Sequence, residues 1–473
     1  MKPLYINGDW VTTKNKLSVH NPATGEIVSD VAFGGKEEAQ SAVDAADKAF
    51  STWSKATAKE RSDILKRWFS LIQDHKESIG RLMTSEQGKP LPEAIGEVEY
   101  ANSFVEWYAE EGKRVYGDII PTSFKSKRIY VTKQPIGVIA AITPWNFPAA
   151  MITRKIAPAL AAGCTAVIKP AEETPLTALR LAELAHEAGI PKGVLNVVLG
   201  EAQEIAEVWQ KDPRIRKISF TGSTEVGKIL MRGASQTVKK VSFELGGHAP
   251  FIVFPDTDLD FAVNGLLKSK FRNAGQTCVC TNRVYVHDSI YEQFVQKTIE
   301  KIAGLKVGSG LEEGITIGPL INHEAKKKVQ SHIKDAEEKG GQLYYHNNQT
   351  INDGDLFVPP VVISNANDDM LCMNEETFGP VAPIARFQTA DEVIKRANDT
   401  PYGLAAYLYT DNLSDAIKVS EGLDYGIIGV NDSLPSVVQA PFGGMKESGI
   451  GREGGYYGIE EYLETKYTSI RIR

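Results

Sequence analysis

The sequence predicts an α/β protein built from two parallel-sheet domains and a small β arm. Two observations support this prediction: short apolar runs alternate with helical stretches from Pro135 onward, and a second series of the same kind begins near Ala249. Short apolar runs joined by helical crossovers are typical of a parallel sheet that is covered on both faces. A chain of 473 residues is also too long for one ordinary hydrophobic core, so we expect it to divide.

The expected elements follow in order along the chain. Residues 1 to about 35 contain strand-like pieces separated by turn signals, and the apolar spacing of residues 36–53 predicts the first of several helices that continue to about Val115. The alternating stretch 128–134 predicts a strand that leaves the main body, and 462–473 predicts a strand that pairs elsewhere, with another subunit as one option. Buried strands are expected at 138–142, 166–169, 194–198 and 217–220, and in the second series at 250–254, 283–287, 382–387 and 405–409.

Composition excludes several classes of protein. With 60 acidic and 53 basic residues the net charge is −7, which repels phosphate backbones, so no nucleic acid partner is expected. The basic cluster 326–328 is interpreted as a solvated helix face. No apolar segment has the length of a secretory signal or a membrane span, so we expect a soluble protein without a membrane partner. The four cysteines are interpreted as reduced thiols of a cytoplasmic protein, and their spacing predicts no metal site.

Cys278 is the candidate nucleophile. It lies in a small, polar, turn-prone stretch, residues 271–280, of a protein that has few cysteines. A thiolate can attack a carbon centre when its loop keeps it accessible and nearby donors favour the ionised form. The alternative is a small buried hydrophobic residue, which is what most cysteines are.

Polar residues directly follow apolar runs at four places, where a parallel sheet would present them in a cleft. Asn146 offers a side-chain NH2 that could hold an oxyanion, although it could equally cap a helix N-terminus. Glu244 ends a probable strand just before Gly246 and Gly247. It could act as a general base, and a surface glutamate before a turn is the alternative.

The other two places suit a dinucleotide. Lys169 and Glu172 follow a strand end, where a carboxylate could bind both hydroxyls of an adenosine ribose and repel a 2′-phosphate, which favours NAD over NADP. Glu172 could instead stabilise the N-terminus of a helix. Gly222 and Ser223 join a strand to a helix, where a bare backbone can approach a pyrophosphate.

Together these segments resemble the aldehyde dehydrogenase superfamily along almost the whole chain. Within it, the chain is most similar to succinate-semialdehyde dehydrogenases through residues 149–155, 278–280 and 451–454. The motifs that carry the resemblance are PWNFP at 144–148, KPAE at 169–172, FTGS at 220–223, ELGG at 244–247, GQTC at 275–278, ETFGP at 376–380 and PFGG at 441–444.

The resemblance implies two Rossmann-like domains and an oligomerisation arm. The cofactor-binding domain would comprise residues 1–120 and 140–246, and the catalytic domain residues 247–440. Residues 121–139 and 441–473 would form the arm. An exposed strand pair adds readily to a neighbour's sheet edge, so a homodimer or homotetramer is expected.

The resemblance also implies a mechanism and a set of site residues. Cys278 would attack an aldehyde, Asn146 and the Cys278 N–H would hold the oxyanion, hydride would pass to a nicotinamide, and Glu244 would activate the water that hydrolyses the thioester. NAD is the expected cofactor because of Glu172, with NADP as the alternative. The residues that would line the cofactor cleft are Trp145, Lys169, Glu172, Gly222, Ser223, Leu245, Glu376 and Phe378.

Two arginines suggest the kind of aldehyde. Arg154 lies in an apolar stretch and Arg272 lies shortly before Cys278, and an arginine in such surroundings needs a partner. If both reach the aldehyde pocket they could clamp a carboxylate, with Ser436 as a third contact implied by the resemblance. The alternative is that one arginine pairs with a protein carboxylate.

Other interpretations stay open. The same machinery could oxidise glycolaldehyde, lactaldehyde or betaine aldehyde, and a cofactor-free cysteine hydrolase or a non-catalytic relative are further alternatives. Cys280 could form a reversible disulfide with Cys278. In an extended strand the two side chains would point to opposite faces, which favours two independent thiols.

Overall fold

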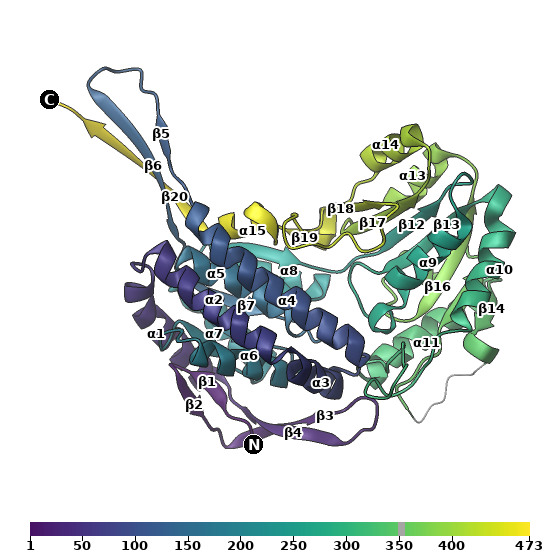
Figure 1. Cartoon of the computed structure of the whole chain (residues 1–473), viewed down its shortest axis with the longest axis horizontal. Helices are drawn as coiled ribbons and strands as arrows, with labels where there is room; N and C mark the ends of the chain where they lie inside the picture. Colours follow the sequence, from purple (N-terminus) through teal and green to yellow (C-terminus); the bar gives the residue numbers. More distant parts are fainter. Residues whose placement is uncertain (349–354) are drawn as a thin grey trace.

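Two lobes and a projecting arm make up the molecule. The computed structural model describes residues 1–348 and 355–473 of the chain, and Figure 1 shows the lobes side by side, with the arm leaving the first of them. The predicted α/β class with parallel sheets is confirmed.

The first lobe is built on an eight-stranded sheet whose middle strands are parallel. Its strand order is β19-β11-β10-β7-β8-β9-β1-β2. The strands are β1 (Leu4–Ile6), β2 (Asp9–Val11), β7 (Val138–Ile142), β8 (Thr165–Lys169), β9 (Leu195–Val197), β10 (Ile215–Thr221), β11 (Lys240–Glu244) and β19 (Gly449–Ile450). A separate antiparallel ribbon is formed by β3 (Asn15–His20) and β4 (Ile27–Phe33).

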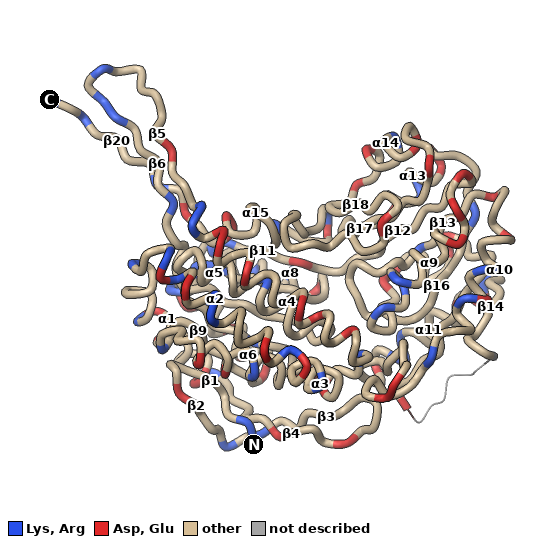
Figure 2. The backbone as a smooth tube through the Cα atoms, in the orientation of Figure 1, with Lys and Arg blue, Asp and Glu red and all other residues tan. Residues whose placement is uncertain are grey.

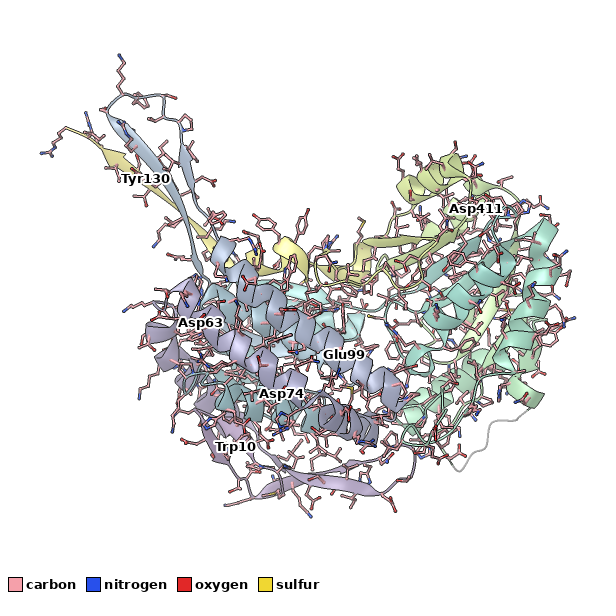
Figure 3. All side chains as sticks on the ribbon, in the orientation of Figure 1. Trp10, Asp63, Asp74, Glu99, Tyr130 and Asp411 are labelled. Atoms are coloured by element: carbon pink, nitrogen blue, oxygen red, sulfur yellow. The ribbon has the colours of Figure 1, made fainter. Side chains whose placement is uncertain are left out.

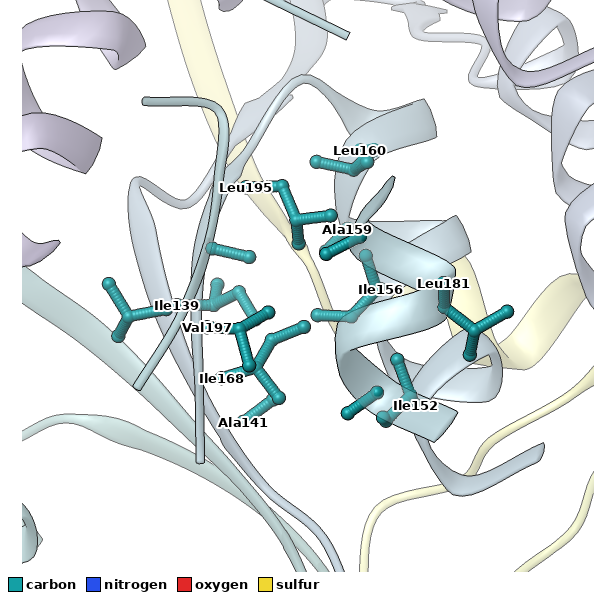
Figure 4. Close-up of a cluster of buried hydrophobic side chains, with 14 of the residues drawn as sticks. Ile139, Ala141, Ile152, Ile156, Ala159, Leu160, Ile168, Leu181, Leu195 and Val197 are labelled. Atoms are coloured by element: carbon teal, nitrogen blue, oxygen red, sulfur yellow. The ribbon is translucent and has the colours of Figure 1, made fainter. Parts of the chain in front are cut away.

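Helices bury the apolar faces of this sheet. Every residue of α5 is buried, and most of its side chains are apolar; the exceptions are Thr153, Arg154 and Lys155. Figure 4 shows Ile152 and Ile156 of α5 in one cluster with Ile139, Ile168 and Val197 of the sheet. The helices of this lobe are α1 (Lys36–Trp53), α2 (Ala58–Asp74), α3 (Lys76–Gln87), α4 (Leu91–Glu111), the short 3-10 helix η1 (Gly112–Arg114), α5 (Ala150–Ala162), α6 (Pro175–Glu187), α7 (Ala202–Lys211) and α8 (Thr224–Ser235).

The second lobe repeats the architecture with a seven-stranded sheet. Its order is β14-β15-β16-β13-β12-β17-β18, and the strands are parallel except for β14. The strands are β12 (Ala249–Val253), β13 (Thr281–His287), β14 (Gln342–Tyr345), β15 (Val361–Ser364), β16 (Val381–Phe387), β17 (Ala405–Tyr409) and β18 (Ile427–Val430). The helices are α9 (Leu259–Lys270), η2 (Arg272–Gly275), η3 (Asp288–Ile290), α10 (Tyr291–Ile302), α11 (His323–Glu338), η4 (His346–Asn348), α12 (Leu371–Asn374), α13 (Ala390–Asn398) and α14 (Leu413–Gly422).

The arm is a three-stranded antiparallel sheet of β5 (Asp118–Ile120), β6 (Lys127–Pro135) and β20 (Leu463–Arg471). Strand β20 pairs with β6 along its whole length, and the side chain of Tyr130 extends from β6 in Figure 3. The expected arm strands 128–134 and 462–473 are therefore present.

The predicted arm segment 441–473 was too long. It also contains η5 (Lys446–Ser448), β19 and α15 (Gly455–Glu460). Strand β19 pairs with the end of β11, so this part of the chain joins the sheet of the first lobe and only β20 lies in the arm. A strand of two residues carries too little pattern to be recognised in the sequence.

Charge is distributed over both lobes. Acidic and basic residues alternate along the tube in Figure 2 without a large field of one sign. Among the described residues, no helix combines the length and the hydropathy that a membrane span requires.

Candidate active site

A cleft of about 490 Å³ is lined by residues of both lobes. The strands β7, β10 and β11 end at this cleft, as parallel strands in such sheets commonly do at a binding site. Most of the predicted site residues line it, from Trp145, Asn146, Gly222, Ser223 and Leu245 of the first lobe to Cys278, Glu376 and Phe378 of the second.

Cys278 lies in a tight turn after η2. Asn273 and Ala274 have φ of 51° and 54°, in the left-handed region that non-glycine residues seldom adopt. The turn closes where the Cys280 N–H donates to the Thr277 carbonyl at 3.0 Å. Gly247 packs against it so closely that an added Cβ would lie 2.3 Å from the Cys278 carbonyl oxygen. The local geometry thus fixes the thiol at the cleft.

The environment of Cys278 favours the neutral thiol. Burial raises the pKa of the Cys278 thiol to about 12, and the nearby Arg154 opposes that shift. The thiol is partly exposed in the cleft, so a ligand can reach it. Cys278 must therefore lose a proton before it can act as a nucleophile.

Asn146 faces the same turn. It lies between β7 and α5, and because Ala149 is the N-cap of α5, the helix-cap alternative for Asn146 is wrong. Its Nδ2 donates to the Gln276 carbonyl at 3.0 Å, and its Oδ1 has no hydrogen-bond partner in the described part of the chain. A second N–H of the same amide is left for a ligand, as an oxyanion donor requires.

Glu244 ends β11 and is only 2 % exposed, so the alternative of a surface glutamate is wrong. Within residues 1–348 and 355–473, its Oε2 has no hydrogen-bond partner. Burial, and then the neighbouring Glu453, raise the pKa of Glu244 well above its usual range. A carboxyl group in this state suits a general base at neutral pH better than a solvated one.

A buried ionic cluster lies next to Glu244. Glu453 forms ion pairs with both Arg154 and Lys155, and Lys155 also donates to the hydroxyl of Thr221 at 2.6 Å. Burial alone would raise the pKa of Glu453, but the two cations lower it. This role of Glu453 could not be predicted from the sequence, because its partners are separated from it by about 300 residues.

The N-terminus of α8 lies at the cleft. The Gly222 N–H donates to the Glu244 carbonyl at 3.1 Å, and the Ser223 hydroxyl caps the helix by accepting from Val226 at 3.3 Å. Free N–H groups at a helix N-terminus bind anions, so this end fits a pyrophosphate.

Aromatic and acidic side chains complete the cleft. Trp145 and Phe378 meet edge to face with ring centres 5.6 Å apart, and Phe378 has a positive φ of 55°. Glu376 accepts from the Gly247 N–H at 3.0 Å, and burial raises the pKa of Glu376 to about 7. An apolar slot with one carboxyl group fits a nicotinamide ring and its ribose.

Lys169 and Glu172 do not line the cleft cavity. They form an ion pair of 2.7 Å just after β8, and the Glu172 side chain is 35 % exposed. The carboxylate therefore has an ammonium beside it and still reaches solvent, where a ribose could approach.

The sequence missed the start of α11 as part of the cleft. Ile321, Asn322 and Lys328 line it, whereas residues 326–328 were expected to form a solvated face. Lys326 is in fact 3 % exposed. The lysine spacing alone could not show which face of α11 turns toward the other lobe.

A model of the aldehyde dehydrogenase family matches residues 10–468. The chain belongs to this family. Members use NAD or NADP to oxidise aldehydes to acids. This chemistry suits the Cys278 thiol and the Asn146 amide, which line the cleft, and the buried Glu244 carboxyl at the end of β11, which does not line it.

Its relatives within the family are similar over nearly their whole length. The chain is 55 % identical over 467 residues to the mitochondrial succinate-semialdehyde dehydrogenase of Arabidopsis thaliana, covering 98 % of this chain and 88 % of the relative. It is 54 % identical to the NADP(+)-linked succinate-semialdehyde dehydrogenase GabD of Escherichia coli, with 99 % and 97 % covered. It is also 54 % identical to a glutarate-semialdehyde dehydrogenase of Pseudomonas putida, again with 99 % and 97 % covered.

A solved structure shares the fold. The aldehyde dehydrogenase of Brucella melitensis biovar abortus 2308 superimposes with a TM-score of 0.98 at 53 % identity, covering 100 % of this chain and 98 % of that one.

The two arginines of this aldehyde dehydrogenase lie in different surroundings. Arg154 is buried, forms an ion pair with Glu453 and has its guanidinium carbon 4.0 Å from the centre of the Phe442 ring. Arg154 is therefore the arginine that pairs with a protein carboxylate, as the alternative interpretation expected for one of the two. Its guanidinium also lies 3.4 Å from the sulfur of Met151, which lines the cleft.

Arg272 retains an unmet hydrogen-bonding group. Its Nε is buried and has no hydrogen-bond partner among the residues that the structure describes. It lines a second, small cavity of about 30 Å³ together with Ser436, Tyr407 and Val279, the residue after Cys278. The structure thus brings Arg272 and Ser436 together beside Val279, whereas Arg154 lines neither of these two cavities.

Cys280 is buried behind the cysteine turn. Its thiol donates to the Gly275 carbonyl at 3.2 Å and accepts from Lys270 at 3.7 Å. Residues 277–280 form a turn. The expectation that the Cys278 and Cys280 side chains point to opposite faces assumed an extended strand, so it does not apply here. Both cysteines are free thiols.

Proposed function

We propose that this aldehyde dehydrogenase oxidises succinate semialdehyde to succinate. The observation that carries the proposal is the buried, unpartnered Nε of Arg272 in a small cavity that it shares with Ser436 next to Val279. A guanidinium and a hydroxyl in that position suit the carboxylate of a short substrate whose aldehyde lies at Cys278. The relatives that act on succinate semialdehyde support the same assignment.

Catalysis begins at Cys278. The thiolate attacks the aldehyde carbon, a C–S bond forms, and the carbonyl electrons move to the oxygen, which accepts from the free N–H of Asn146. Arg154 places a positive charge near the sulfur and favours the thiolate. Arg272 and Ser436 hold the far carboxylate, so the aldehyde is presented in one orientation.

Glu244 serves the second half of the reaction. A bound nicotinamide supplies the acceptor for the hydride that leaves the substrate carbon. Cys278 is then part of a thioester, and the Glu244 carboxylate takes a proton from the water that attacks it. The C–S bond breaks, which releases the newly formed carboxylic acid and restores the Cys278 thiolate, while the proton taken from water is on Glu244.

The cleft residues fit a nicotinamide dinucleotide. Gly222 and Ser223 at the start of α8 would hold the pyrophosphate, Glu376 and Phe378 the nicotinamide ribose and ring, and Lys169 with Glu172 the adenosine ribose. We propose NAD as the preferred cofactor, because the Glu172 carboxylate would repel a 2′-phosphate. The paired Lys169 weakens that repulsion, so NADP is the alternative.

The aldehyde has a separate approach. A third cavity of about 320 Å³ shares Arg272 and Leu434 with the small cavity and shares no lining residue with the cofactor cleft. Substrate and cofactor could therefore reach Cys278 from different sides.

We also propose a homodimer or homotetramer that works in the cytoplasm. The exposed strand edge and the apolar side chains of the arm support assembly. The free thiols of all four cysteines suit a reducing compartment.

Glutarate semialdehyde, one methylene longer, is the second candidate. A relative of 54 % identity acts on it. The small volume around Arg272 favours the shorter aldehyde, and one methylene is worth about 10- to 200-fold in kcat/KM.

The mechanism is tested with Glu244→Gln. In a rapid-mixing experiment with succinate semialdehyde and NAD, we expect a burst of about one reduced cofactor per site and then a steady rate lowered about 100-fold, because thioester hydrolysis has lost its base. Cys278→Ser is the matched control and should show neither phase. Steady turnover of Glu244→Gln at the wild-type rate would contradict the assignment.

A further inference from the structure

A buried lysine outside the cleft holds the turn that carries Asn146. Lys89 lies between α3 and α4, and its side chain is 1 % exposed. Its ammonium donates to the backbone carbonyl of Asn146 at 2.7 Å and lies 4.1 Å from the centre of the Phe147 ring. Lys89 is therefore hydrogen-bonded to the backbone of Asn146, the residue whose side chain offers the oxyanion donor.

A carboxylate on α4 keeps this lysine charged. Burial lowers the pKa of Lys89, and the adjacent Glu97, itself 1 % exposed, opposes the shift by forming an ion pair with it. The other oxygen of Glu97 accepts from the N–H groups of Ala149 and Ala150 at 2.9 and 3.3 Å. The pair thus joins α4 to the start of α5, immediately after the Asn146 turn.

The same turn is linked to the cysteine loop of the other lobe. Gln87 accepts from the Lys89 N–H at 3.0 Å and donates to the Asn273 side chain at 3.0 Å. Asn273 in turn donates to the carbonyls of Asn146 and Gln276 at 3.1 and 3.2 Å. The carbonyl of Asn146 is therefore held from both lobes, and its amide is held against Gln276, two residues before Cys278.

We propose that Lys89 is a positioning residue for the oxidation of the aldehyde: through its ion pair with Glu97 it fixes the Asn146 backbone, and so aims the Asn146 amide at the oxygen of the substrate bound to Cys278. The proposal rests on the proposed role of Asn146. Misplacing a catalytic donor by a fraction of an ångström weakens its interaction with the transition state, whereas the binding of substrate and cofactor elsewhere in the site continues.

A double-mutant cycle tests the proposal. Lys89→Met, Asn146→Ala and the double variant are compared by kcat and KM for succinate semialdehyde, with the dissociation constant of NAD measured by fluorescence. We expect Lys89→Met to lower kcat about 10- to 100-fold in the wild-type background and less than about threefold in the Asn146→Ala background, with KM and NAD binding changed by less than about threefold in each.

The chain offers a matched control. Lys217 is also fully buried, pairs with Glu461 at 3.1 Å and lies 5.3 Å from the ring of Tyr462, but it contacts neither the Asn146 turn nor the cysteine loop. Lys217→Met should lower the melting temperature as Lys89→Met does. Its effect on kcat should be the same with and without Asn146.

The outcomes separate this inference from the proposed function. If Lys89→Met costs the same factor in both backgrounds, its effect is structural and the inference is overturned. If Asn146→Ala leaves kcat unchanged, Asn146 is not the oxyanion donor, and both that part of the proposed function and the inference about Lys89 are wrong. If Lys89→Met does not fold, Glu97→Gln makes the same test, because its amide oxygen can still accept from Ala149 while Lys89 loses its charged partner.

Discussion

At the scale of single residues, burial sets the chemistry of the site. Cys278 and Glu244 both have pKa values raised by burial, so burial disfavours the charged form of each group. The cationic Arg154 opposes the shift at both groups. The reaction therefore depends on moving protons between poorly solvated groups rather than on a preformed thiolate.

This predicts how the free enzyme reacts with iodoacetamide. Only the thiolate is alkylated. Because the pKa of Cys278 is about 12, the thiolate fraction at lower pH increases about tenfold with each unit by which the pH is raised. We expect the alkylation rate to rise without a plateau from pH 6 to 9 in the absence of cofactor, monitored by mass spectrometry. Cys278→Ser is the control, because the other three cysteines are buried. A plateau near pH 7 would show a lowered pKa and contradict this account.

Residue types in sequence context predicted the chemical groups but not their partners. Asn146 and Glu244 were recognisable because each follows a short apolar run at a predicted strand end, and Cys278 because it lies in a polar, turn-prone stretch of a protein with few cysteines. Glu453 and Lys89 were not, because their roles come from ion pairs and hydrogen bonds to residues far away in the chain. Periodicity says nothing about such contacts.

At the scale of elements, the turn between β8 and α6 is expected to set the choice of cofactor. Lys169 and Glu172 are paired there, and the half-exposed carboxylate is the group that would meet a 2′-phosphate. When Glu172 is replaced by a neutral residue, the positive charge of Lys169 is no longer paired with it and should attract the 2′-phosphate of NADP.

We expect Glu172→Ser to shift the ratio of kcat/KM for NAD over NADP toward NADP by about tenfold or more. The matched control is Glu173→Ser, the neighbouring glutamate, which should leave the ratio within about threefold of the wild type. An unchanged ratio in Glu172→Ser would assign cofactor choice to another element.

Most buried strands could be predicted, and the short edge elements could not. The strands of both parallel sheets are continuous apolar runs of a characteristic length, so β7, β13 and β17 were located from the sequence. The two-residue β19 and the cleft-facing end of α11 carry no such pattern. The position of β19 is decided by its pairing with β11, a strand about 200 residues earlier in the chain.

At the scale of the whole molecule, the arm exposes apolar side chains that a monomer would leave in water. Ile119 and Ile470 are 76 % and 44 % exposed on β5 and β20, the two outer strands of the arm sheet. Exposed apolar strands of this kind are commonly covered by another subunit.

We therefore expect the double variant Ile119→Asp and Ile470→Asp to have a lower molar mass than the wild type in size-exclusion chromatography with light scattering, since two buried charges would destabilise the interface. Lys125→Asp, a charge change on the same arm, should leave the mass unchanged. An unaltered mass in the double variant would show that the arm does not hold the assembly together.

The central claim is that Arg272 and Ser436 select an aldehyde with a carboxylate. The most direct test compares kcat/KM for succinate semialdehyde and for butanal, which has the same chain length, in the wild type and in Arg272→Met. The account predicts a preference of about 100-fold or more for succinate semialdehyde in the wild type, or about 2.7 kcal/mol in transition-state binding, which Arg272→Met reduces to within about tenfold. Equal rates for the two aldehydes in the wild type would contradict it and would make this enzyme a general aldehyde dehydrogenase.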